Sequence, residues 1–193
     1  MKTKTSDHRI PDAKPYGPAA KRTAKKAITA LVPGSYDPVT EGHMALIRHA
    51  SEKYRKVYAV IFVNKDKTYR FSLEKRLEML RAACARYENV TVDADGGMLW
   101  EYAKRKRIRV TVRGWRDEKD LAYEEEMARF NQSALPTLRT ELIRSEGAYE
   151  HLSSSYVRAL LDKGETPEGL VPEEAMPVLT EEETKRKNRK KKE

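Results

Sequence analysis

The run from Val57 to Val63, Val-Tyr-Ala-Val-Ile-Phe-Val, restricts the fold more than any other segment, because it is nearly all apolar. A strand of this composition must be buried on both faces. Strands buried in this way occur in parallel sheets that helices cover on each side. The run therefore predicts an α/β protein in which residues 57–63 form a strand with no solvent-facing side.

Segments of helical periodicity alternate with β-prone runs along the rest of the chain. The predicted strands cover residues 27–32, 57–63, 90–92, 108–112 and 138–143. The predicted helices cover residues 44–54, 72–86, 98–106, 119–134 and 155–162, and Ser72 is the predicted N-cap of the second. This alternation predicts an open, mostly parallel, five-stranded α/β sheet with helices on both faces. Ligands bind at the carboxyl ends of the strands in such sheets, so we expect the functional residues there.

The formal net charge of +9 is concentrated at the two ends of the chain. Residues 1–26 carry a net +6 and residues 181–193 a net +3, whereas residues 27–180 hold 24 charges of each sign. Both ends have too little apolar surface to offset the entropy of ordering. We therefore expect a folded domain at 27–180 between a disordered N-terminal extension and a disordered C-terminal tail. We expect both ends to be solvated, with weak contact with RNA as the alternative.

The composition excludes several classes of protein. The single cysteine, Cys84, excludes a disulfide framework and a Cys-rich zinc module. Its position on an apolar helix face predicts a core residue rather than a reactive thiol. The sequence has no apolar run of about 18 residues and no apolar segment typical of a secretory signal. We therefore expect no transmembrane helix and a cytoplasmic protein.

The segment after the first predicted strand is suited to binding an anion. Gly34 permits close approach of the backbone to a ligand, and Asp37 begins a turn with the proline that follows. Thr40 is a good N-cap, which makes His43 the third residue of the next helix. Free amides and the helix dipole favour an anion in that first turn, where an imidazole can donate to a phosphoryl oxygen. The alternative is that His43 is only a surface or capping residue.

Three motifs resemble those of a known enzyme family. Residues 33–43, Pro-Gly-Ser-Tyr-Asp-Pro-Val-Thr-Glu-Gly-His, resemble the (H/T)-x-G-H signature of the nucleotidylyltransferase superfamily, which has a Rossmann-like fold. Residues 112–116, Val-Arg-Gly-Trp-Arg, resemble the R-G-x-R strand end of phosphopantetheine adenylyltransferases. Residues 152–158, Leu-Ser-Ser-Ser-Tyr-Val-Arg, are similar to the I-S-S-S-x-V-R helix start of that family. The resemblance implies a nucleotidylyltransferase catalytic domain at 27–180.

The resemblance implies transfer of the adenylyl group of ATP to 4′-phosphopantetheine, which forms dephospho-coenzyme A and pyrophosphate in coenzyme A biosynthesis. The reaction brings two anions together, so catalysis requires positioning and charge stabilisation without a covalent enzyme intermediate. The resemblance also implies Mg²⁺ as a cofactor and a homohexamer. The sequence contains no evident cluster of metal ligands, so we expect nucleotide oxygens and water to hold the Mg²⁺.

The matching positions imply a candidate site. The implied catalytic residues are His43, Lys67 and Arg116. The implied ATP-binding residues are Ser35, Tyr36, His43, Gly114, Arg116, Glu124, Ser153, Ser154, Ser155 and Arg158. The implied residues for the second substrate are Ser35, Lys67, Met98, Leu99, Arg113, Tyr123 and Asn131. His43 would stabilise the α-phosphate, Lys67 would bridge it to the acceptor phosphate, and Arg113 would contact the acceptor phosphate.

The remaining roles follow from the same resemblance. Ser154 and Ser155 would contact the β- and γ-phosphates, and Arg116 would contact the ATP phosphates. Glu124 would lie near the ribose or an ordered water.

Several of these residues have simpler interpretations. Lys67 could be a flexible loop cation, and Arg113 and Arg116 could form surface ion pairs with the acidic residues that follow them. Helix capping explains one of the three serines, and Tyr123 could be a core residue.

Two departures from the family pattern leave the acceptor specificity open. Gly97 lies in a segment where the family often has an acidic residue, and Glu125 replaces an apolar one. One alternative function is a related nucleotidylyltransferase with another phosphorylated acceptor. A second is an RNA-binding protein that acts through its basic ends, with salt-dependent binding.

Overall fold

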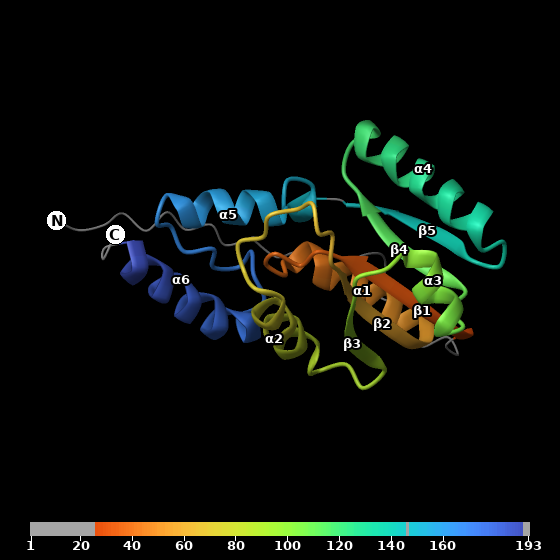
Figure 1. Ribbon diagram of the computed structural model, residues 1–193, viewed down its shortest axis with the longest axis horizontal. Helices are drawn as coiled ribbons and strands as arrows, with labels where there is room; N and C mark the ends of the chain where they lie inside the picture. Colours follow the sequence, from red (N-terminus) through yellow and green to blue (C-terminus); the bar gives the residue numbers. More distant parts are fainter. Residues whose placement is uncertain (1–25, 146, 191–193) are drawn as a thin grey trace.

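The computed structural model describes residues 26–145 and 147–190. This part of the chain forms one parallel sheet of five strands in the order β3-β2-β1-β4-β5, with helices on both sides (Figure 1). The strands are β1 (Lys26–Gly34), β2 (Tyr54–Phe62), β3 (Val90–Asp95), β4 (Val110–Trp115) and β5 (Arg139–Arg144). The helices are α1 (Glu41–Lys53), α2 (Leu73–Cys84), α3 (Leu99–Arg105), α4 (Glu118–Ala134), α5 (Ser154–Asp162) and α6 (Met176–Lys190). The predicted five-stranded, Rossmann-like α/β fold is confirmed.

The two central strands divide their side chains between two apolar cores. Ala30 and Val32 of β1 lie in one core, whereas Leu31, between them, lies in the other. The same alternation runs along β2 from Val57 to Ile61, as expected for strands whose successive side chains point to opposite faces. Residues of α1, α2, α5 and α6 close the first core, and residues of α3 contribute to the second. The prediction that the apolar run is buried on both faces is therefore confirmed.

Several helices begin with a side-chain N-cap. Thr40, Ser72, Asp117 and Ser153 each accept a hydrogen bond from the backbone N–H three residues later, at the starts of α1, α2, α4 and α5. Thr40 and Ser72 are the caps that the sequence predicts. Each cap satisfies an amide that the first helical turn leaves without an intrahelical partner. The caps thus fix where these helices begin.

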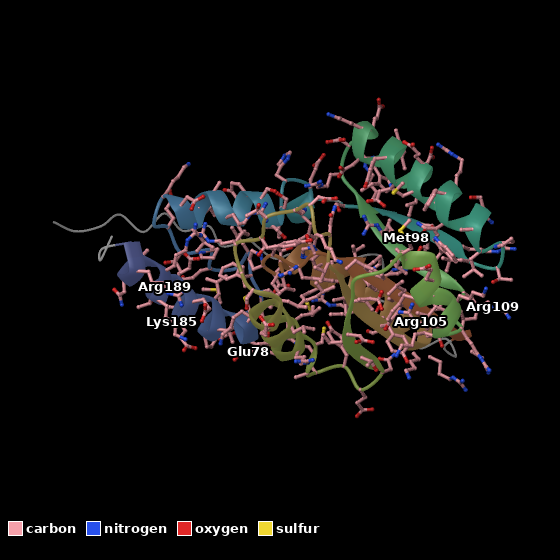
Figure 2. All side chains as sticks on the ribbon, viewed as in Figure 1. Glu78, Met98, Arg105, Arg109, Lys185 and Arg189 are labelled. Atoms are coloured by element: carbon pink, nitrogen blue, oxygen red, sulfur yellow. The ribbon has the colours of Figure 1, made fainter. Side chains whose placement is uncertain are left out.

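The C-terminal segment differs from the prediction. Residues 181–190 belong to α6, so the expectation of a disordered tail is wrong over this range, and the expected boundary at 180 falls inside a helix. Leu179 and Glu183, four residues apart and therefore on one face of α6, are both buried. The net charge of residues 181–193 does not reveal this buried face of α6. The other side of α6 is exposed and carries cations such as Lys185. Figure 2 shows Lys185 and Arg105 at opposite ends of the molecule.

Three further expectations concern Cys84, the N-terminal extension and transmembrane helices. Cys84 is buried in the first core, and burial raises the pKa of its thiol to about 12, which confirms a packing role. The expected disordered extension at 1–26 lies outside the described residues, apart from Lys26 in β1. No helix in the described part combines the length and apolar character needed to cross a bilayer.

Candidate active site

Two adjoining cavities lie at the carboxyl ends of the strands. An apolar cavity of about 460 Å³ is lined by Phe62, Met98, Leu99, Met127 and Phe130 among others. A polar cavity of about 360 Å³ is lined by His43, Arg116, Asp120, Ser153 and Ser154 among others. Both are lined by Pro33, Gly34, Ser35, Lys67, Arg113, Tyr123 and Glu124. The shared residues therefore mark the junction where a ligand in one cavity would meet a ligand in the other.

His43 lies in the first turn of α1, and its ring is oriented by the residue that caps the helix. The backbone N–H of Thr40 donates to Nδ1 of His43 at 3.0 Å, and Oγ1 of Thr40 lies 2.9 Å from the same atom. A backbone N–H can only donate, so Nδ1 is an acceptor. The neutral ring therefore carries its proton on Nε2. His43 does take part in capping the helix, and because the cap uses Nδ1, Nε2–H is left as the donor that the functional interpretation requires.

The charge state of His43 follows from its surroundings. Burial disfavours the imidazolium, and the positive charges of Arg113 and Arg116 disfavour it further. Together they lower the pKa of His43 to about 4. At neutral pH the ring is thus an uncharged hydrogen-bond donor at the edge of the polar cavity.

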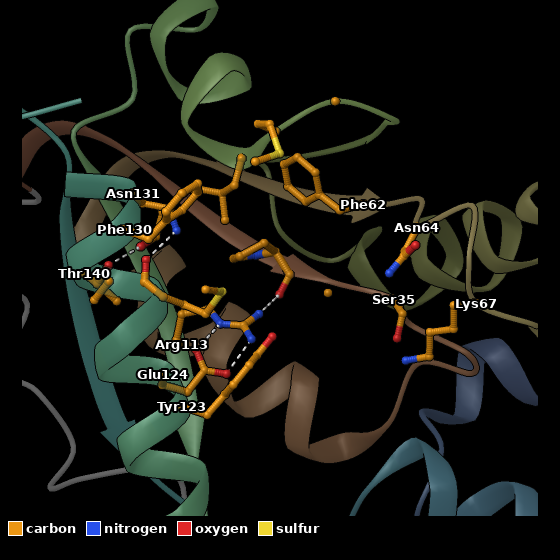
Figure 3. Close-up of a pocket in the computed structure, with 18 of the residues that line it drawn as sticks. Ser35, Phe62, Asn64, Lys67, Arg113, Tyr123, Glu124, Phe130, Asn131 and Thr140 are labelled. Carbon is orange, nitrogen blue, oxygen red and sulfur yellow. Dashed lines mark hydrogen bonds and ion pairs between the residues drawn. The ribbon is translucent and has the colours of Figure 1, made fainter. Parts of the chain in front are cut away.

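Arg113, at the end of β4, is held by a carboxylate and a carbonyl (Figure 3). Its Nε donates to Oε2 of Glu124 at 2.7 Å, its Nη2 donates to Oε1 of Glu124, and its Nη1 donates to the carbonyl of Pro33 at 2.9 Å. The Glu124 carboxylate is buried and the Arg113 side chain is 30 % exposed. Of the five guanidinium N–H groups, these bonds use three, so two are left for a ligand at the cavity junction.

This pairing adds a contact that the sequence did not predict. Glu124 contacts Arg113, whereas the resemblance implies the ribose or an ordered water as its partner. Both residues line both cavities, and their ligand contacts remain predictions. Arg116 shows the predicted alternative of a local ion pair, because its Nε lies 2.7 Å from Oδ2 of Asp120, four residues later in the first turn of α4. Arg116 nevertheless lines the polar cavity.

The three serines at the start of α5 are in different surroundings. Ser153 accepts from the N–H of Tyr156 at 3.1 Å, and Ser154 donates to the carbonyl of Pro38 at 2.8 Å. Both line the polar cavity. Ser155 is exposed and accepts from Arg158 at 2.9 Å. Neither Ser155 nor Arg158 lines either of the two cavities, so their contacts with ATP remain predictions without geometric support.

Tyr36 occupies the space above Gly34. Its ring is fully buried, and its hydroxyl donates to the carbonyl of Val32 at 2.8 Å. A Cβ at position 34 would come within 2.9 Å of this ring. The glycine therefore accommodates a tyrosine, in addition to lining both cavities as expected. Only the backbone of Tyr36 could reach a nucleotide, because the side chain belongs to the core.

Helix α4 forms one wall of the apolar cavity. Tyr123, Glu124, Met127 and Asn131 follow helical spacing along this wall. Tyr123 is 57 % exposed, so the alternative of a core residue is wrong. The predicted residues Met98 and Leu99, at the start of α3, also line this cavity. The sequence reasoning missed lining residues that include Phe62, Asn64, Tyr69, Thr111, Met127, Phe130 and Thr140. Met127 could have been found from the spacing between positions 124 and 131.

Lys67 reaches the site from the loop between β2 and α2. Residues 64–68 of this loop are all exposed. Lys67 lines both cavities, whereas its neighbours Lys65 and Asp66 line neither. The placement at the junction favours the functional interpretation over that of a flexible loop cation.

The described residues contain no group of three or more His, Cys, Asp or Glu side chains that could hold a metal ion. The polar cavity does offer two carboxylates, Glu124, which pairs with Arg113, and Asp120, which pairs with Arg116. It also offers hydroxyls, among them those of Ser35, Ser153 and Ser154. Hard oxygen donors of this kind suit Mg²⁺ that keeps most of its ligands from phosphate and water. The residues therefore fit a metal that arrives with a nucleotide.

Comparison with known proteins identifies relatives over most of the chain. The cytidylyltransferase-like family matches residues 31–160. A phosphopantetheine adenylyltransferase of Symbiobacterium thermophilum is 41 % identical over 145 residues, which cover 75 % of this chain and 90 % of the relative. A phosphopantetheine adenylyltransferase of Clostridium botulinum (strain Hall) is 34 % identical over 151 residues, which cover 78 % of this chain and 92 % of the relative. The family match at residues 31–160 includes all of the predicted site residues that line the two cavities.

Proposed function

The chain belongs to the phosphopantetheine adenylyltransferase family, and on that premise we propose that it transfers the adenylyl group of ATP to 4′-phosphopantetheine. The observation that carries the proposal is the junction of the two cavities. An apolar cavity and a polar cavity share two cations, Lys67 and Arg113. Two anionic reactants placed in these cavities would meet between the cations, which lowers the cost of bringing their phosphates together.

The polar cavity suits the triphosphate of ATP. Gly42 and His43 in the first turn of α1 and Ser153 and Ser154 at the start of α5 line it. Free amides and the positive ends of helix dipoles at such places favour phosphate oxygens. Arg116 adds a positive charge at the same cavity. These features support the assignment of His43, Arg116, Ser153 and Ser154 to ATP.

The apolar cavity suits the pantetheine arm. Phe62, Leu99 and Met127 supply apolar surface along it, and Asn131 supplies an amide. Nδ2 of Asn131 donates to the carbonyl of Met127 at 2.8 Å, so its Oδ1 can accept from an amide N–H of the arm. A mostly apolar pocket with a few placed polar groups is typical of small-molecule sites.

The reaction needs no enzyme nucleophile. An oxygen of the acceptor phosphate forms a bond to the α-phosphorus, and the bond from that phosphorus to the β-bridging oxygen breaks with release of pyrophosphate. The acceptor phosphate is already ionised, so no base must remove a proton. Nε2–H of His43 would donate to an α-phosphate oxygen as charge develops on it, and Lys67 would neutralise both phosphates.

We propose that Mg²⁺ accompanies the nucleotide. Asp120 and the cavity hydroxyls would hold it only in part, with phosphate oxygens and water as the other ligands. The ion would supply neutralisation of the polyphosphate charge. We further propose a homohexamer and a cytoplasmic location from the family resemblance, and light scattering of the purified protein tests the former.

The direct test is incubation of the protein with ATP, MgCl₂ and 4′-phosphopantetheine. We expect stoichiometric formation of pyrophosphate and dephospho-coenzyme A. A parallel panel of other phosphorylated acceptors tests the alternative substrate. Turnover with another member of the panel, and none with 4′-phosphopantetheine, would contradict the proposal. Salt-dependent RNA binding without any turnover would favour the RNA-binding alternative.

A further inference from the structure

The side chain of Arg70, three residues after Lys67, is buried among acidic groups from the C-terminal part of the chain. Its Nε and Nη2 each donate to one carboxylate oxygen of Glu183 in α6, both at 2.7 Å. Its Nη1 donates to Asp162 at the end of α5, at 2.6 Å. The side chains of Arg70 and Glu183 are only 6 % and 10 % exposed. A two-pronged, buried ion pair of this kind fixes both partners in one geometry.

The backbone at Arg70 is held as tightly as its side chain. The buried carboxylate of Asp37 accepts from the N–H of Arg70 at 2.9 Å and from the N–H of Phe71 at 3.0 Å. Asp37 belongs to the segment between β1 and α1 that leads to His43. The carbonyl of Asp37 in turn accepts from Arg158 of α5 at 2.6 Å. Position 70 is thus the point at which the Lys67 loop joins α5, α6 and the anion-binding segment.

The loop before this point has few contacts of its own with the domain. The hydrogen bonds described for residues 64–67 lie within the loop, from the N–H groups of Asp66 and Lys67 to Asn64 and from Asn64 to the hydroxyl of Tyr69. The ring of Tyr69 lies 3.9 Å from the guanidinium carbon of Arg76, which donates to the carbonyl of Ser35. The anchors at 69 and 70 therefore determine where Lys67 lies.

We propose that the Arg70–Glu183 pair is a positioning device for adenylyl transfer, through which α6 holds Lys67 at the junction of the two cavities. The proposal rests on the proposed function, in which Lys67 contacts both phosphates. It assigns a role in the reaction to a helix whose described residues line neither cavity. Arg70 and Glu183 act through Lys67 and touch no substrate.

The test is a double-mutant cycle with Lys67. Glu183→Gln keeps the size of the side chain and removes its charge, so Arg70 loses its strongest anchor. We expect kcat/KM for 4′-phosphopantetheine to fall about tenfold, since displacement of a substrate-positioning group is costly even when the change is remote. In a Lys67→Ala background, Glu183→Gln should cause no further loss, because the group through which it acts is absent.

A second readout follows the loop directly. Hydrogen exchange of the amides of residues 64–71 should be faster in Glu183→Gln than in the wild type. Glu181→Gln is the matched control, since it removes a Glu on the same helix that pairs with exposed Lys185 at 2.6 Å. We expect this control to leave both kinetics and loop exchange unchanged. Arg70→Lys keeps the charge but lacks the two-pronged geometry, so it should give an intermediate loss, and it serves if Glu183→Gln fails to fold.

Two results would overturn the proposal. The first is wild-type kcat/KM in folded Glu183→Gln, and the second is an equal loss from Glu183→Gln with and without Lys67, which would indicate a general effect on the fold. Absence of turnover in the wild type and in Glu181→Gln would instead overturn the proposed function, and the catalytic role of the pair with it. The control thus separates the two failures.

Discussion

The two cations at the junction of the cavities are held in opposite ways. Arg113 projects from the end of a strand, and three of its N–H groups are already bonded to Glu124 and the Pro33 carbonyl. Lys67 projects from an exposed loop and depends on anchors two and three residues further along. The guanidinium of Arg113 is therefore oriented before substrate binds. The position of Lys67 is fixed only through its backbone, so its side chain can reorient towards a ligand.

The difference indicates a division of labour. A pre-oriented group loses little entropy on binding, so Arg113 is suited to fixing the position of a phosphate. Lys67 has more rotamer freedom to lose, and this suits a group that must adjust as charge moves between two phosphates. Substitution of Arg113 should therefore affect both activity and stability, whereas substitution of Lys67 should affect activity alone.

The largest effect is expected at His43, which lines the polar cavity beside these two cations. His43→Ala should lower kcat at least about a hundredfold with a modest change in the KM for ATP, as loss of a transition-state donor does. Steady-state kinetics with both substrates measure this. An unchanged kcat would refute the assigned role of Nε2–H.

Arg113→Ala should affect activity and stability together. We expect the KM for 4′-phosphopantetheine to rise more than the KM for ATP. We also expect a loss of about 2 kcal/mol in unfolding free energy, below the figure for a fully buried pair because Arg113 is 30 % exposed. Denaturant titration measures the loss. The double variant Arg113→Ala/Glu124→Ala is the control, and it should recover part of the stability because no buried carboxylate is left unpaired. A larger rise in the KM for ATP would mean that the cavities are assigned the wrong way round.

Lys67→Ala should affect activity alone. We expect kcat/KM to fall about tenfold or more while the unfolding free energy stays within about 0.5 kcal/mol of the wild type, as for an exposed residue. Lys65→Ala, two positions away in the same loop and outside both cavities, is the matched control. Equal effects of the two substitutions would show that Lys67 is a flexible loop cation without a specific role at the cavities.

The last expected effect is on the pH dependence of stability. The pKa of His43 is about 4 in the folded protein, below the value of an unfolded histidine, so the unfolded chain binds the proton first. Folded stability attributable to His43 is therefore lost as the pH falls from about 6.5 towards 4. In thermal melts, the Tm of the wild type minus the Tm of His43→Asn should fall as the pH is lowered through this window, because asparagine does not titrate. A constant difference would contradict the lowered pKa.

Much of the fold followed from local patterns. The apolar run at 57–63 predicted a doubly covered strand, and Thr40 and Ser72 predicted helix starts that the structure confirms. Most of the predicted site residues also line one or both cavities, because motifs at successive strand ends meet at one edge of a parallel sheet.

The remainder depends on contacts between residues far apart in the sequence. A charge sum over 181–193 could not reveal that Glu183 is buried against Arg70, 113 positions earlier. The pairing of Arg113 with Glu124 and the packing of Tyr36 over Gly34 likewise depend on tertiary geometry. Spacing identifies which side chains share an edge or a face, but not which of them bond to each other.

The strand order divides the active site between two stretches of chain. β1 is central, with β2 and β3 on one flank and β4 and β5 on the other. His43 and Lys67 are supplied before the exposed turn at 96–97, and Arg113, Glu124 and Ser153 after it. Of two polypeptides divided at that turn, one would carry β1 to β3 with His43 and Lys67, and the other would carry β4 and β5 with Arg113 and Ser153. Turnover from a mixture of the two would then report complementation, since neither fragment alone carries both of the cations that line the two cavities.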